Sequence, residues 1–85
     1  MKFKETIYQV LIEQGLHPGW VGNSIRIDQV FMIRFYPDGE SYELMRFFSR
    51  KGWKSMAITK DAYTIAQMIK TQLHATPGSD RGMEA

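Results

Sequence analysis

The most informative absences in this 85-residue chain are those of cysteine and of any long apolar run. Without cysteine the protein has neither a disulfide bond nor a thiolate metal site to stabilise it. No stretch reaches the roughly 18–20 consecutive apolar residues that a membrane-spanning helix needs. The first residues also lack the apolar segment of a secretory signal. We therefore expect a cytoplasmic protein with no membrane partner, stabilised by packing and aided by a second copy or another partner.

Acidic residues are missing from residues 44–60, a segment that we call the basic ribbon. Its cations are Arg46, Arg50, Lys51, Lys54 and Lys60. The ribbon carries a formal charge of +5, whereas the whole chain sums to +2. Phe47, Phe48 and Trp53 are interspersed among these charges. A cationic, aromatic segment can bind phosphate and stack on bases, and it can equally bind an acidic protein surface.

Length and composition predict one small globular domain. A chain of 85 residues lies near the lower end of what folds alone, so its core is small. Its content of 44% hydrophobic and 24% charged residues argues against intrinsic disorder. We expect a single α+β domain over residues 1–75, followed by a disordered tail at residues 76–85, which has no hydrophobic period.

The first predicted helix spans residues 2–14 and carries a broad apolar arc. Its main stripe consists of Phe3, Ile7, Val10 and Leu11. Tyr8 and Ile12 widen this arc to about 200° at the ~100° per residue of a helix. Either the helix contacts both the sheet and the second helix, or Tyr8 and Ile12 face a second copy or a partner. Gly15 suits the left-handed position that ends a helix, and Pro18 prevents its continuation.

A second amphipathic helix is predicted after the basic ribbon. Thr59 is expected to cap it, and Asp61 lies in its first turn, where the helix dipole favours an acid. Its apolar stripe consists of Ala62, Ile65, Ala66, Ile69 and Leu73. The opposite side is polar, so we expect this helix to cover a sheet with one face only.

The strongest local signal is a β-hairpin. Two β-rich runs flank the Asp38-Gly39 pair, which favours a two-residue turn because both of its positions want positive φ. The register that this turn sets pairs Phe35 with Tyr42, Ile33 with Leu44, and Arg34 with Glu43. The first two pairs are apolar partners on one face, and the third is an ion pair on the other. A slip of one residue would destroy all three agreements.

The remaining strands complete an α+β fold. Along the chain, we expect a helix, a three- to four-stranded antiparallel sheet and a second helix. Residues 53–58 predict a strand after a turn at residues 50–52. Residues 24–28 form either an earlier strand or the start of one long bent strand, and a short strand near Trp20 is a further candidate. The expected core face consists of Phe31, Ile33, Phe35, Tyr42, Leu44, Met56 and Ile58.

The other face of this sheet is too apolar to be fully exposed to solvent. It carries Val30, Met32, Arg34, Met45, Phe47 and Trp53. If the helices cover opposite faces, these residues are core and the basic ribbon is a solvated edge. If both helices share one face, this surface is open and suited to an interaction. The residues predicted to bind are then Arg34, Arg46, Phe47, Arg50, Lys51, Trp53 and Lys54.

Part of the chain resembles a known family. Lys51-Gly52, a final strand that ends at Ile58-Thr59 and an amphipathic helix from Asp61 are similar to the closing portion of PC4-like single-stranded-DNA-binding coactivators. This resemblance implies a twisted antiparallel sheet, single-stranded DNA as the ligand and a dimer formed through the helix. The chain departs from the family in having a whole helix before the sheet and in lacking a serine- or lysine-rich lead-in.

Catalysis is not expected. His17 lies beside a proline in a loop, and His74 lies on the polar side of the second helix. No pair of residues has metal-ligand spacing and no phosphate-binding glycine motif occurs, so we expect no metal and no other cofactor. The carboxylates are scattered, whereas general acid–base chemistry needs them positioned in a shielded cleft.

Two functions remain open. The first is a non-enzymatic module that engages nucleic acid, single-stranded above all, or a nucleoprotein complex through the basic, aromatic sheet face. The second is an inhibitor or adaptor that acts by protein–protein binding. The small size, lack of cysteine and apolar surface resemble the style of phage and mobile-element accessory proteins, including anti-CRISPR proteins. A structural homodimer through the first helix or the open sheet is a third candidate.

Overall fold

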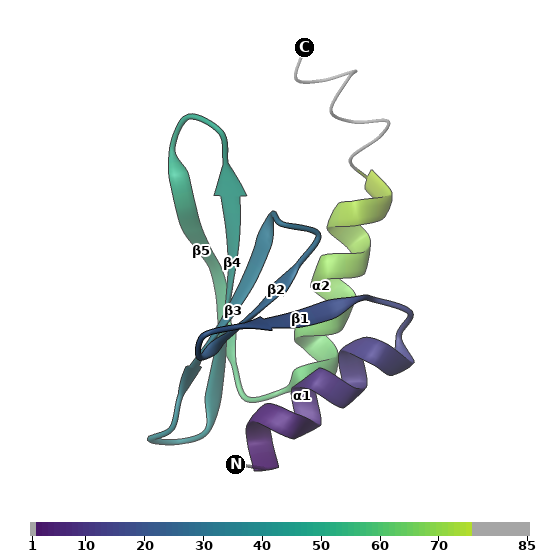
Figure 1. Cartoon of the computed structure of the whole chain (residues 1–85), viewed down its shortest axis with the longest axis vertical. Coiled ribbons are helices and arrows are strands. Elements are labelled where there is room, and N and C mark those ends of the chain that lie inside the picture. The colour runs from purple at the N-terminus through teal and green to yellow at the C-terminus, as the bar shows by residue number, and fades with distance from the viewer. Residues whose placement is uncertain (1, 76–85) are drawn as a thin grey trace.

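The computed structural model describes residues 2–75, which form a five-stranded sheet and two helices on one side of it (Figure 1). The elements are α1 (Lys2–Glu13), β1 (Pro18–Val21), β2 (Ser24–Ile27), β3 (Phe31–Tyr36), β4 (Ser41–Phe48), β5 (Gly52–Thr59) and α2 (Ala62–Ala75). The strands are antiparallel and lie in the order β1-β2-β3-β4-β5. The α+β class is confirmed, the expected three or four strands are wrong, and the tail predicted at residues 76–85 lies outside the described residues.

The strands that the sequence left ambiguous are β1 and β2. Asp28 and Gln29 both have positive φ, at 54° and 63°, and reverse the chain between β2 and β3. Ser24–Ile27 is therefore a strand of its own. β1 contains Pro18 and Gly19, residue types that are depleted in strands, which is why its β signal is weak.

Both helices pack against the same face of the sheet. Ile7 of α1 and Ile69 of α2 belong to one buried cluster with Ile33 of β3 and Leu44 of β4. Figure 1 shows the two helices together on one side of the strands. Of the two arrangements that the sequence allowed, the protein therefore adopts the one that leaves the opposite sheet face without a helix.

The ends of the helices follow from local hydrogen bonds. The amides of Gly15 and Leu16 donate to the carbonyls of Ile12 and Leu11, both at 3.0 Å, which is the Schellman pattern expected at Gly15. The cap of α2 differs from the prediction. The carboxylate of Asp61 accepts the amide of Tyr63 and the hydroxyl of Thr64, so Asp61 is the cap. The Thr59 hydroxyl instead accepts the amide of Asp61, one step outside the helix.

The β3–β4 hairpin has the predicted register but a different turn. Phe35 lies opposite Tyr42, Ile33 opposite Leu44, and Arg34 opposite Glu43. The connection is longer than the Asp38-Gly39 pair, since β3 ends at Tyr36 and β4 begins at Ser41. Positive φ falls on Gly39 and Glu40, whereas Asp38 is not among the positive-φ residues. The apolar pairing thus determined the register independently of the turn geometry.

A β-bulge changes the faces of β5. Leu44 pairs with Ala57 and Met45 pairs with Ser55, so Met56 is an extra residue on β5. Beyond this point the alternation of β5 is reversed. Ile58 was expected in the core, but it lies opposite Glu43 and is 62% exposed, so that expectation is wrong. Met56 does pack against the core, as predicted.

Candidate binding face

The sheet surface opposite the helices is the candidate site, and we call it the open face. Antiparallel partners project to the same side of a sheet, so the register defines its members. They include Arg26, Met32, Arg34, Tyr36, Glu43, Met45, Phe47, Trp53, Ser55 and Ile58. Val30 was also expected here, but it packs against the buried core.

An arginine and two aromatic rings form a cluster on the open face, near the turn that joins β4 to β5. The guanidinium carbon of Arg26 lies 5.0 Å from the centroid of the Trp53 ring. The Phe47 ring meets Trp53 edge-on, with centroids 5.4 Å apart and planes at 61°. Trp53 is half-buried between these neighbours, whereas Phe47 is 39% exposed. This arrangement joins β2 with the β4–β5 hairpin.

Arg26 is a member of this cluster that the sequence did not single out. Its alternation with Ile25 and Ile27, both buried, placed it on the opposite side of the strand from the core. Its position beside Trp53 also requires the β2–β3 register, which depends on the positive-φ turn at Asp28. A non-glycine turn of that kind has a weak sequence signal, so the long-range contact was not predictable.

The acidic group on the open face is withdrawn from solvent. Glu43 is only 7% exposed, and the Tyr36 hydroxyl donates to its Oε1 at 2.5 Å. Hydrogen bonds from Ser55 and Tyr36 lower the pKa of Glu43, and the charge of its register partner Arg34 adds a smaller effect. The same bond to Glu43 raises the pKa of the Tyr36 phenol. Among the described residues, the charges that this face offers to a ligand are those of Arg26 and Arg34.

The seven predicted binding residues do not share one surface. Arg34, Phe47 and Trp53 lie on the open face. Arg50 and Lys51 are exposed in the turn that joins β4 to β5, beyond the aromatic pair. The remaining two, Arg46 and Lys54, are register partners of each other on the helix-covered side of the hairpin.

Arg46 is an internal residue of the helix-covered side. It lies opposite Phe31 in the register, and its guanidinium carbon is 5.8 Å from the Phe31 ring and 5.1 Å from the Phe48 ring. Its Nη1 donates to the side-chain oxygen of Gln72 on α2. Strand alternation thus places the rings Phe47 and Trp53 of the basic ribbon on the open face, whereas its strand cations Arg46 and Lys54 lie on the opposite side.

The two residues predicted as a dimer or partner face on α1 have different environments. Tyr8 stacks on Trp20 of β1 with centroids 5.4 Å apart and planes at 2°, and its hydroxyl donates to the Pro18 carbonyl at 3.1 Å. The contact with β1 accounts for the breadth of the apolar arc at Tyr8. Ile12, one helical turn further along the same side of α1, is 46% exposed.

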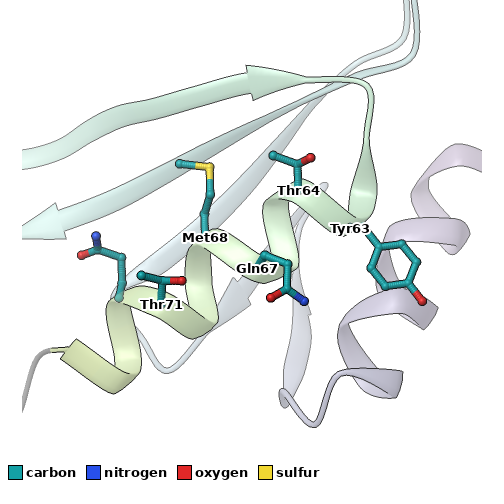
Figure 2. A pocket seen from close by; sticks show the side chains of 6 residues that line it. Tyr63, Thr64, Gln67, Met68 and Thr71 are labelled. Carbon is teal, nitrogen blue, oxygen red and sulfur yellow. The ribbon is translucent and has the colours of Figure 1, made fainter.

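Concave surfaces occur on the helix side of the molecule. One groove of about 440 Å³ is lined by Tyr63, Thr64, Gln67, Met68, Thr71 and Gln72, all from α2. Figure 2 shows these side chains along the helix, with Thr64 and Met68 extending from the same side. The lining has no ionisable group other than the phenol of Tyr63, so this groove offers no general acid–base pair at neutral pH.

Residues 2–75 contain neither a candidate metal site nor a membrane-spanning helix. No group of three or more His, Cys, Asp or Glu side chains lies close enough to hold a metal ion in this part of the chain. Neither of its helices has the length and apolar character needed to cross a membrane. His17 and His74, the two histidines, are both exposed.

Known proteins offer no direct guide to this surface. No protein-family model, no curated protein and no solved structure matches the chain. The resemblance of β5 and α2 to PC4-like coactivators, and the likeness in style to anti-CRISPR proteins, therefore stay predictions. The open face is interpreted from its own geometry and charge.

Proposed function

We propose that this protein is a non-enzymatic module that binds single-stranded nucleic acid through the open face. One observation carries the proposal: a sheet face free of helices combines Phe47 and Trp53 with Arg26 and Arg34, while its acid, Glu43, is buried. Positive charge together with an exposed ring is complementary to a phosphate backbone and an unpaired base.

Base stacking on an aromatic side chain favours a single strand over a duplex as the ligand. Stacking of a base on an aromatic side chain contributes about 1–3 kcal/mol and is available only when the base is free of its own stack. Phe47 is 39% exposed and can contribute this term. Arg50 and Lys51 in the adjacent turn extend the cationic surface, so that a backbone leaving Phe47 meets further positive charge.

The proposal is tested by the fluorescence anisotropy of short labelled single strands of DNA and RNA, with a duplex of the same sequence as the control. We expect binding at low salt that weakens linearly with the logarithm of salt concentration, because bound counterions are released. Phe47→Ala should weaken the binding of single strands by roughly tenfold, the equivalent of one lost stacking contact. Absence of binding at low salt would refute the proposal.

A second function is favoured by a specific feature of the same face. Ile58 is 62% exposed on the open face, where Met32 and Met45 lie opposite each other in the register. Nucleic acids make little use of aliphatic surface, whereas protein partners bury it. The alternative is thus an inhibitor or adaptor that docks an acidic protein. A partner retained after nuclease treatment, and lost on Ile58→Lys, would favour this function over the first.

A further inference from the structure

We infer that a base bound at the open face stacks on Phe47 and on the guanidinium plane of Arg26, with Trp53 as the ring that positions both. The inference rests on the proposed function and assigns the roles within it. It changes the expectation from the sequence, in which Trp53 was itself a stacking residue and Arg26 had no role.

The surroundings of Trp53 support a positioning role. Arg26 lies over its ring at 5.0 Å, and Phe47 packs against it at 5.4 Å, so two neighbours already occupy the ring. Trp53 is accordingly half-buried, whereas Phe47 is 39% exposed. The ring that is free to receive a base is therefore that of Phe47. Trp53 holds the other two side chains in place.

Arg26 is suited to extend the stacking surface. A guanidinium is planar and delocalised, and bases stack on arginine planes as they do on aromatic rings. Within the described chain, Nε of Arg26 is buried and has no hydrogen-bond partner, and the guanidinium carbon lies 5.0 Å from the centroid of the Trp53 ring, which orients the side chain. A guanidinium held in this way keeps its charge for the adjacent phosphate.

The test is Arg26→Lys, which retains the positive charge but removes the plane. Arg46→Lys is the matched control on the opposite face, because Arg46 also lies over aromatic rings but contacts Gln72 of α2. We expect Arg26→Lys to lower the affinity for a single strand by roughly tenfold with an unchanged salt dependence, and Arg46→Lys to leave both unchanged. An abasic strand of equal charge should bind the wild type and Arg26→Lys equally.

Each other outcome has a defined meaning. If Arg26→Lys binds base-containing strands as well as the wild type, or if Arg46→Lys weakens this binding equally, the inference is wrong while the proposed function stands. If the wild type binds no strand, the proposed function itself fails. Should Arg26→Lys not fold, as judged by circular dichroism, Phe47→Leu replaces it. That variant must lose the preference for base-containing over abasic strands, and retention of the preference would overturn the inference.

Discussion

Arg26 and Arg46 make the same local contacts on opposite faces of the sheet. Each guanidinium lies over an aromatic ring, and each has a buried Nε without a hydrogen-bond partner among the described residues. Arg46 also donates to Gln72 of α2, whereas no helix covers Arg26. The comparison teaches that the placement of the helices, more than the local chemistry, separates a structural arginine from one available to a ligand.

The largest expected difference between the two faces is in stability. Leu44 is fully buried under the helices, and the next residue, Met45, lies half-buried on the open face. We expect Leu44→Ala to lower the free energy of unfolding by about 2–5 kcal/mol, since it leaves a cavity in a small core. Met45→Ala should cost clearly less. Urea denaturation measures both, and equal costs would mean that the open face is covered in solution.

A smaller effect concerns the buried acid of the open face. Hydrogen bonds from Ser55 and Tyr36 lower the pKa of Glu43 below its ordinary value of 4.5, so its ionised form stabilises the folded state. This stability is fully present above the ordinary value and is lost as the pH falls through the lowered one. We expect Glu43→Gln to cost about 1–3 kcal/mol at pH 7, from the loss of charge-assisted hydrogen bonds.

The pH dependence provides the control for that prediction. Because the amide introduced by Glu43→Gln does not titrate, the difference in unfolding free energy between the two proteins should shrink as the pH falls below 4.5. Denaturation curves at neutral and acidic pH measure this difference. A gap that stays constant with pH would show that Glu43 contributes by packing and not by its charge.

We expect the same substitution to have opposite effects at Arg46 and at Arg26. Arg46→Lys removes a guanidinium that lies between two rings and donates to Gln72, so we expect a loss of about 1 kcal/mol in unfolding free energy. Its affinity for single strands should not change. Arg26→Lys should do the reverse, with weaker binding and little change in stability. Anisotropy titrations measure the affinity of both variants for single strands, and denaturation curves measure their unfolding free energies. If both variants lost affinity, or both lost stability, the comparison would be contradicted.

The parts of the fold that could be predicted are those with local, redundant signals. The end of α1 at Gly15 and the β3–β4 register each depend on neighbouring residues that agree with one another. β2 had a weaker signal because its turn to β3 uses Asp28 and Gln29, at which positive φ is rarely expected. The signal of β1 was weak because the strand contains Pro18 and Gly19. Phe47 was therefore predicted as a residue of the candidate face, but Arg26 was not, because its contact with Trp53 depends on the β2–β3 register.

The smallest expected effect tests the part of β5 that sequence patterning predicted incorrectly. The bulge at Met56 turns Ile58 onto the open face with 62% exposure, although alternation without a bulge would have buried it. We expect Ile58→Thr to change the unfolding free energy by no more than about 0.5 kcal/mol, because an exposed side chain loses little on truncation. Ala57→Ser is the comparison on the helix side of the same strand and should cost more.

The two variants at residues 57 and 58 distinguish the bulged register from the regular one. In the regular register Ile58 would join Tyr42 beneath the helices, and its truncation would cost at least about 1 kcal/mol. A large loss for Ile58→Thr would therefore mean that β5 pairs without the bulge, and Ile58 would then leave the open face. In the bulged register the open face keeps Ile58 as an exposed aliphatic residue in addition to its arginines, so it can bind a protein partner with both apolar and acidic groups.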